Sequence, residues 1–249
     1  MTERITSRAN AYIRHVKKLR TDRAYRYEHG EYVADGSKLL CEALKWNVPL
    51  SAVLVQDGVT VPSLPDGVRI ISVPETVMQE ASRMQTPQGV IAVCKMPEAP
   101  QLHIEPGCII LDTVQDPGNL GTILRTADAF DIPVILSEGC ADPYGEKTVR
   151  ATMGVPFRTR IMQAGTGEII SACKAVKIPL VVTALTDRAK DLRELPLSTC
   201  DVVICSEGRG ASEAFLSAAD AEAVIPMSSR CESLNAGVAA AIVMWQMRQ

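Results

Sequence analysis

The sequence predicts an α/β protein in which a smaller α/β domain precedes a domain built on a parallel sheet. In the second half, short apolar runs typical of buried strands alternate with segments of helical periodicity. Continuous apolar strands flanked by helices indicate a mostly parallel sheet covered on both faces. The proline-rich stretch 98–106 shows no periodicity, so it is interpreted as a linker between domains at 1–97 and 107–249.

The sequence pattern predicts a separate series of helices and strands for each half of the chain. After basic helices over 7–27, the expected elements are a strand at Tyr32–Ala34, a helix from Gly36 to near Trp46, strands at Ser51–Gln56 and Val68–Ser72, a helix from Pro74 and a strand at Gly89–Lys95. The strands expected in the second half are Cys108–Val114, Pro133–Leu136, Pro179–Ala184, Asp201–Cys205 and Ala223–Pro226. The helices expected between and after them are Leu120–Phe130, Gly145–Met153, Gly167–Lys177, Ser212–Ala219 and Ser233–Gln249.

The composition favours a globular protein and argues against a whole-surface nucleic-acid binder. The 249 residues are 47% hydrophobic and carry a formal net charge of −3. No apolar run approaches the roughly 20 residues of a membrane span, and the N-terminus lacks the apolar core of a signal peptide. The 8 cysteines form no C-x-x-C pair and have no neighbouring histidine, which favours reduced thiols in a cytoplasmic protein over a metal site.

Positive charge is concentrated at the start of the chain. Only Glu3 and Asp22 are acidic among residues 1–26, whereas the basic residues there are Arg4, Arg8, Arg14, Lys17, Lys18, Arg20, Arg23 and Arg26. One interpretation is a solvated helix face. The other is a surface that contacts nucleic-acid phosphates, with interleaved tyrosines able to stack on bases.

Three polar loops follow apolar strands of the second half, where a parallel sheet places its ligand crevice. In the first, Pro117-Gly118 predicts a turn and Asn119 is expected to cap the helix that carries Arg125. This loop is either a capped helix with a solvent-facing arginine or an anion site, since helix N-termini and guanidinium groups both bind phosphate. The pair Gly118 and Gly121 matches neither a P-loop nor a dinucleotide fingerprint.

The other two loops place polar groups beside small residues. In the second, Glu207 follows a buried strand and precedes a glycine that lets a ligand approach the backbone, although Glu207 could also cap the next helix. In the third, Ser233 stands where an N-cap is expected, and Asn235 follows it beside Ala236 and Gly237. Helix capping explains each loop alone, but three such loops at the strand ends of one sheet predict a ligand site.

Jointly, the three loops resemble the motifs of the SPOUT superfamily of AdoMet-dependent methyltransferases, specifically the SpoU/TrmH-like RNA ribose 2′-O-methyltransferases. The motifs are matched in family order by Asp116–Phe130, by Ser206-Glu207-Gly208-Arg209-Gly210, and by Ile225-Pro226-Met227 with Ser233-Leu234-Asn235. The first half resembles the L30e-like RNA substrate-binding domain often found before this catalytic domain, notably in Thr86-Pro-Gln-Gly-Val-Ile-Ala-Val93.

The resemblance implies features that periodicity does not predict. It implies a deep trefoil knot near the C-terminus, which is otherwise almost absent among folds, and a homodimer with active sites at the subunit interface. It also implies S-adenosyl-L-methionine (AdoMet) as cofactor and RNA as partner, with neither a membrane nor a metal. Ribosomal RNA is favoured over transfer RNA because a separate N-terminal domain is present, which is an argument by analogy.

The resemblance also assigns roles to residues. Arg125 is expected to act on the ribose 2′-hydroxyl as a base or as a stabilising cation, and the second role is easier because arginine rarely gives up its proton. The other expected catalytic residues are Asn119, Glu207, Ser233 and Asn235. The cofactor is expected to contact Cys205, Ser206, Gly208, Ile225, Met227 and Leu234, and RNA to contact Arg8, Arg14, Lys17, Lys18 and Arg20.

Cys205 departs from the family pattern, and residues 107–249 contain no histidine. Cys205 stands where the family commonly has glycine, and AdoMet binding is expected to survive if that strand end is open. His15, His29 and His103 all precede the second half, which excludes a Ser-His-Asp hydrolase or a histidine-ligated metal site confined to residues 107–249.

Three other hypotheses stay open at this point. The first is a transfer-RNA methyltransferase of the same class. The second is an RNA-binding or assembly protein that has lost catalysis, against which the retained polar motif residues argue. The third is a nucleotide-binding α/β enzyme with another cofactor, for which the sequence contains no matching phosphate motif.

Overall fold

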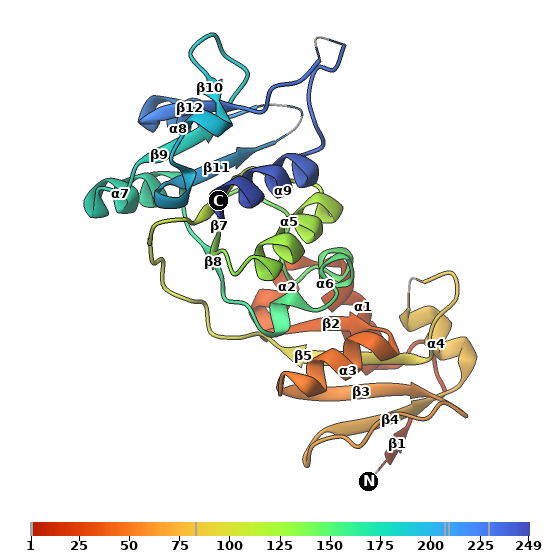
Figure 1. Ribbon diagram of the computed structural model, residues 1–249. Helices are drawn as coiled ribbons and strands as arrows, with labels where there is room; N and C mark the ends of the chain where they lie inside the picture. Colours follow the sequence, from red (N-terminus) through yellow and green to blue (C-terminus); the bar gives the residue numbers. More distant parts are fainter. Residues whose placement is uncertain (1, 83, 207, 209, 229) are drawn as a thin grey trace. The chain divides into compact units, whose positions relative to one another are not determined.

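The computed structural model describes residues 2–82, 84–206, 208, 210–228 and 230–249, and the chain forms two compact units (Figure 1). The first unit is Met1–Glu98 together with Tyr144–Arg158, and the second is Ala99–Pro143 with Thr159–Gln249. Among the described residues, no helix is long and apolar enough to cross a membrane. The sequence pattern predicts one division of the chain, near the linker, so the place of Tyr144–Arg158 in the first unit is new information.

The first unit contains a mixed sheet. Its described strands are β1 (Thr2–Arg4), β2 (Glu31–Asp35), β3 (Leu50–Gln56), β4 (Arg69–Val73) and β5 (Val90–Lys95). Their order is β1-β4-β3-β5-β2, with β4 parallel to β1 and β3, and β5 antiparallel to β3 and β2. The helices are α1 (Ala11–Thr21), α2 (Arg23–His29), α3 (Ser37–Lys45), α4 (Glu75–Ala81) and α6 (Glu146–Thr152), and the 3₁₀ helix η1 (Val155–Phe157) follows α6.

The basic N-terminal region forms two helices because Asp22 interrupts it. Asn10 begins α1 by accepting a hydrogen bond from the Tyr12 amide, and Ile13, Val16 and Leu19 form its buried stripe. Asp22 ends α1 in an extended conformation and begins α2 by accepting from the Tyr25 amide. Gly30, with φ 62°, then ends α2 in the left-handed conformation that glycine adopts freely.

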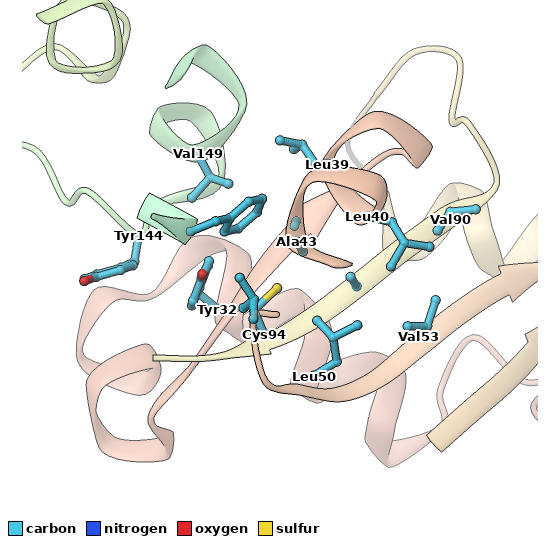
Figure 2. Packing of buried hydrophobic residues seen from close by; sticks show 14 of the residues in the cluster. Tyr32, Leu39, Leu40, Ala43, Leu50, Val53, Val90, Cys94, Tyr144 and Val149 are labelled. Atoms are coloured by element: carbon cyan, nitrogen blue, oxygen red, sulfur yellow. The ribbon is translucent and has the colours of Figure 1, made fainter. Parts of the chain in front are cut away.

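Residues 144–158 complete the hydrophobic core of the first unit (Figure 2). Tyr144, Val149 and Phe157 belong to the buried cluster that contains Tyr32. The Tyr32 ring centroid lies 5.2 Å from that of Tyr144 and 6.3 Å from that of Phe157. A segment that follows two strands of the second sheet in sequence is therefore part of the first unit's core.

The second unit is built on a parallel sheet, as the alternating pattern predicts. Its described strands are β6 (Ile109–Asp112), β7 (Val134–Leu136), β8 (Ile161–Gln163), β9 (Leu180–Thr183), β10 (Lys190–Asp191), β11 (Asp201–Cys205) and β12 (Ala221–Val224). Their order is β10-β12-β9-β11-β6-β7-β8, and each neighbouring pair is parallel. The helices are α5 (Pro117–Ala129), α7 (Thr166–Val176), α8 (Glu213–Ala218) and α9 (Ala236–Met247), with 3₁₀ helices η2 (Leu192–Glu194) and η3 (Leu197–Thr199).

Two predicted helix caps are wrong, and each true cap has a clear physical cause. Pro117 fits the first helical position of α5, so the preceding Asp116 is the cap and accepts from the Asn119 amide at 2.8 Å. Asn235, and not Ser233, caps α9, because its Oδ1 accepts from the Gly237 and Val238 amides at 3.1 and 3.3 Å. The side chains of Asn119 and Ser233 therefore do not cap these two helices.

The core position of Phe157 generates a stability prediction. Phe157 is 8% exposed, and Phe157→Ala is expected to lower the free energy of unfolding of the first unit by about 3–4 kcal/mol, as for other truncated core aromatics. Trp46 lies in this unit and Trp245 in the other, so urea unfolding followed by tryptophan fluorescence in a Trp245→Phe background reports on the first unit.

Met153 supplies the matched control from the same segment. Its side chain is 41% exposed, so Met153→Ala is expected to change the same free energy by less than about 0.5 kcal/mol. A Phe157→Ala effect as small as that of the control would show that residues 144–158 do not belong to the core of the first unit.

Candidate cofactor and active site

A cavity of about 360 Å³ opens at the carboxyl ends of β9, β11 and β12. Residues 183–186 end and follow β9, Cys205 and Ser206 end and follow β11, and Ile225 and Met227 follow β12. Ser233 and Leu234 before α9, with Ala236 and Ala239 in its first turns, add another wall. This is the edge of a parallel sheet where ligand crevices form, and the volume is within the range of small-molecule sites.

The described lining of the cavity is apolar apart from a few hydroxyl groups, and it holds no charged side chain. The described apolar residues that line it include Ile204, Leu216, Ala223, Val224, Ile225 and Leu234. Thr183, Thr186, Ser206 and Ser233 supply hydroxyl groups, and no described lining residue is Asp, Glu, Lys, Arg or His. This described lining suits a ligand that carries an apolar ring and a few groups able to accept or donate hydrogen bonds.

Cys205 is held against the neighbouring strand. Its Sγ donates to the Thr183 carbonyl oxygen at 3.4 Å and lies 3.9 Å from Thr183 Oγ1, which donates to the Val203 carbonyl oxygen at 2.8 Å. Burial raises the pKa of the Cys205 thiol to about 12, so the thiol is neutral at physiological pH. The side chain that replaces the family's glycine is thus tied to β9, and a cavity remains beside it.

A buried carboxylate joins the first and second polar loops. Asp112 ends β6 with 1% exposure, and its Oδ2 accepts a hydrogen bond from the Ser212 amide at 2.7 Å. Ser212 immediately precedes α8, so this bond fixes the chain that leaves the cavity after β11. The first two loops are therefore connected directly.

The structure also brings two predicted catalytic residues together. Asn235 Nδ2 donates to Asn119 Oδ1 at 2.9 Å, which joins the N-terminal ends of α5 and α9. The two helices pack side by side (Figure 1). Arg125 is exposed on α5 and makes no hydrogen bond or ion pair with the described residues. Asn119, Arg125 and Asn235 do not line the cavity of their own chain as far as it is described.

The remaining predicted site residues divide into three groups. Ser233 lines the cavity, as do Cys205, Ser206, Ile225, Met227 and Leu234. Gly208 is exposed and does not line the cavity as far as the cavity is described. Glu207 lies outside the described residues, as does its motif neighbour Arg209.

Sequence reasoning missed a fourth loop at this edge. Ala184, Leu185 and Thr186 line the cavity directly after β9. The signal was present, because a polar loop follows an apolar strand here as at the other three sites. No familiar motif marks the segment, and the sequence pattern predicts only that a strand ends at Ala184.

The basic N-terminal residues do not form one uniform surface. Arg8, Arg14, Lys17 and Lys18 are exposed. Lys17 pairs with Glu80, and Lys18 Nζ lies 5.0 Å from the centroid of the Tyr25 ring. These four side chains are accessible to a polyanion.

Arg20 is a correction to the predicted RNA surface. Its side chain is 3% exposed, its Nη2 lies 3.0 Å from Glu146 Oε2, and its Nη1 donates to the Ala81 carbonyl oxygen. A buried and paired guanidinium is not available to phosphate groups. Arg20 instead binds residues 144–158 within the first unit.

Metal ligands are not gathered anywhere in the described part of the chain. Within residues 2–82, 84–206, 208, 210–228 and 230–249, no group of three or more His, Cys, Asp or Glu side chains is placed to hold a metal ion.

The fold and the cavity define an α/β protein with a ligand site at the carboxyl edge of a parallel sheet. The chain belongs to the SpoU rRNA methylase family, whose pattern matches residues 106–245. Residues 10–92 match an MRM3-like substrate-binding domain. The resemblance drawn from the three polar loops is therefore confirmed.

Three full-length relatives support this membership. The chain is 33% identical over 249 residues to the Bacillus subtilis 23S rRNA (guanosine(2553)-2′-O)-methyltransferase RlmP, covering 99% of each chain. It resembles a solved TrmH-family RNA methyltransferase from Porphyromonas gingivalis at a TM-score of 0.84 and 31% identity, covering 96% of this chain and 97% of that one. An AdoMet-bound rRNA methyltransferase from Sinorhizobium meliloti gives a TM-score of 0.86 and 30% identity over 99% and 97% of the chains.

The state of Cys205 generates a reactivity prediction. Because its pKa is raised to about 12, its thiolate fraction at pH 8 is about a thousandfold below that of an ordinary thiol of pKa about 8.5. Iodoacetamide is expected to modify Cys205 at least about 100 times more slowly than the exposed Cys41, as followed by peptide mass spectrometry. Equal rates at the two cysteines would show that Cys205 is neither buried nor held by Thr183.

Proposed function

We propose that this chain transfers a methyl group from AdoMet to a ribose 2′-hydroxyl of ribosomal RNA. The observation that carries the proposal is the cavity at the carboxyl edge of the parallel sheet, whose described lining holds no charged side chain, in a chain of the SpoU family. The RlmP relative is named for 2′-O-methylation of 23S rRNA, and the Sinorhizobium meliloti relative is AdoMet-bound. Ribosomal RNA is therefore preferred over transfer RNA as the substrate.

The residues present fit AdoMet. Ile225 and Leu234 supply apolar surface for an adenine ring, and the hydroxyl groups of Thr183, Ser206 and Ser233 supply hydrogen bonds for ribose or amino-acid groups. Backbone groups beyond the strand ends supply further donors and acceptors, because the ladders of β11 and β12 stop there. When bound, AdoMet supplies an electrophilic methyl group on sulfonium.

The chain's own residues then position the nucleophile. A ribose 2′-hydroxyl must be aligned with the methyl group, and the negative charge that develops on its oxygen must be stabilised. Arg125 is exposed and makes no ion pair with the described residues, so its guanidinium is available to that oxygen or to a neighbouring phosphate. Asn119 and Asn235 orient each other at the start of α5 and α9, and Ser233 and Glu207 complete the proposed catalytic set.

We also propose that the active site is completed in a homodimer through α9. Val238, Ile242 and Trp245 are 48%, 37% and 58% exposed, and their spacing places them on one helix face. The opposite face is buried, so α9 is apolar all round. Exposed apolar surface of this kind marks an interaction site, and a two-fold dimer covers such a face with its own copy.

The position of α5 agrees with a shared active site. Thr122 of α5 lines a shallow apolar hollow of about 380 Å³ together with Val238, Ile242 and Trp245. Arg125 lies one helical turn beyond Thr122 and is exposed. An interface over this hollow therefore lies close to the proposed catalytic arginine.

Three finer features complete the proposal. The trefoil knot implied by the family lies near the C-terminus, with the segment 225–249 passing through it. The first unit is an L30e-like RNA-binding domain whose exposed Arg8, Arg14, Lys17 and Lys18 contact phosphates. A cytoplasmic location agrees with ribosomal RNA as the substrate.

The function is tested by incubating the protein with labelled AdoMet and separate pools of unmodified ribosomal and transfer RNA. The expected result is label on a ribose of ribosomal RNA, mapped by nuclease digestion and mass spectrometry. Label found only on transfer RNA would show that transfer RNA, and not ribosomal RNA, is the substrate. AdoMet binding without transfer to either pool would favour an inactive RNA-binding protein.

Arg125→Ala is expected to lower kcat by at least about 100-fold, because a group that acts on the developing oxyanion is lost. AdoMet binding, measured by calorimetry, is expected to stay within about threefold of wild type, since Arg125 does not line the described cavity. Arg193→Ala, which removes another exposed arginine, serves as control and should retain full activity. Wild-type turnover by Arg125→Ala would remove Arg125 from the mechanism.

Trp245→Glu is expected to convert the proposed dimer into monomers, because it places a charge in the centre of the apolar face. Light scattering coupled to size exclusion measures the mass, and transfer activity should fall with dimer content. Val176→Glu introduces the same charge at a 48% exposed apolar position on α7 and should stay dimeric. A Trp245→Glu protein that remains dimeric would place the interface elsewhere.

A further inference from the structure

Glu222 is a buried carboxylate that the proposed chemistry does not use. It lies on β12 and is 7% exposed. Its Oε2 accepts a hydrogen bond from Thr186 Oγ1, and its Oε1 lies 2.5 Å from Arg188 Nη2. Burying a carboxylate is costly unless it is hydrogen-bonded and paired, so these two contacts account for its charge inside the protein.

Both partners of Glu222 lie on the short loop that joins β9 to β10 across the end of β12. β12 pairs with β9 on one side and with β10 on the other. The Ala184 amide donates to the Ala223 carbonyl oxygen at 2.9 Å, and Lys190 pairs with Ala223 in the sheet. The backbone thus fixes both ends of the loop to β12, and Glu222 binds its middle.

This loop forms one wall of the cavity. Leu185 and Thr186 line the cavity, and Leu185 is 64% exposed. Glu222 itself is not part of the described lining, whereas the next residues of β12, Ala223 and Val224, are. Any effect of Glu222 on a ligand is therefore transmitted through the loop.

We propose that Glu222 is a positioning residue for the cofactor, holding residues 184–189 so that Leu185 covers the bound AdoMet. A leucine exposed beside an open cavity gains favourable apolar burial when a ligand fills that cavity. A loop already fixed in place does not lose further conformational entropy on binding. The inference rests on the proposed function, because it takes the cavity as the AdoMet site.

The test compares variants at both ends of the contact. Glu222→Ala removes both interactions, Thr186→Val removes one hydrogen bond with little change in shape, and Glu222→Gln keeps an acceptor for Thr186 without the charge. Arg193→Ala is the matched control, since Arg193 pairs with Asp191 and its described contacts do not include Glu222. AdoMet affinity is measured by calorimetry, and KM and kcat are measured with ribosomal RNA.

Glu222→Ala is expected to raise the Kd and KM for AdoMet about tenfold while kcat at saturating AdoMet stays within about twofold. Thr186→Val and Glu222→Gln should give smaller increases of about threefold, and Arg193→Ala should give none. A purely structural role would instead lower the melting temperature and the active fraction without this separation of KM from kcat.

Each other outcome counts against the inference. A wild-type Kd in Glu222→Ala overturns it, as does a loss of kcat at unchanged KM. If circular dichroism shows that Glu222→Ala is unfolded, the Kd of Thr186→Val decides, and a wild-type value overturns the inference. Wild-type protein that fails to bind AdoMet contradicts the proposed function itself, which separates the two failures.

Discussion

The parallel pairing of β11 with β9 on one side and with β6 on the other is the constraint on which the candidate site depends. Parallel strands end at the same edge of a sheet, so the chain that leaves each strand emerges beside the others. Residues 183–186, 205–206 and 225–227 therefore form neighbouring walls of the cavity directly after their strands end, and no long loop is needed to bring them together. The Asp112 carboxylate adds a fixed point, because it binds the Ser212 amide across this edge.

The second constraint is that α9 has two apolar faces, one buried inside the second unit and one exposed. One face of the helix is buried with α5 and β11, and the bond between Asn119 and Asn235 holds the N-terminal ends of α5 and α9 together. The other face, with Val238, Ile242 and Trp245, is largely exposed, although the Trp245 ring lies 5.9 Å from that of Phe130. An apolar helix with one free face fits a subunit interface, and α5 brings Arg125 to the same neighbourhood. Assembly and catalysis are thus coupled through one pair of helices in the proposed dimer.

The sequence pattern predicts most helices and strands of the two units but not the short strands β1, β8 and β10. β8 and β10 have three and two residues, too few to show alternation. The helical pattern at Gly145–Met153 indicates a helix, but a helical pattern shows that one face is buried and does not show what buries it. The charge run likewise could not separate Arg20, which is buried beside Leu19, from the exposed Lys17 and Lys18. Motif spacing marked Ile225 and Leu234 in the cavity wall, whereas Leu185 carries no motif and became visible only in three dimensions.

The described lining of the cavity holds no charged side chain, and this bears on the proposed reaction. Methyl transfer neutralises a sulfonium cation, so the positive charge on AdoMet is greatest before the reaction and declines in the transition state. A carboxylate beside the sulfonium would stabilise the reactant more than the transition state and would raise the barrier. No described residue that lines the cavity is anionic, and the nearest buried carboxylate on β12, Glu222, is already bound to Thr186 and Arg188. The described lining thus offers a ligand apolar surface, hydroxyl groups and backbone, and in the proposed mechanism Arg125 stabilises the negative charge that develops on the RNA oxygen.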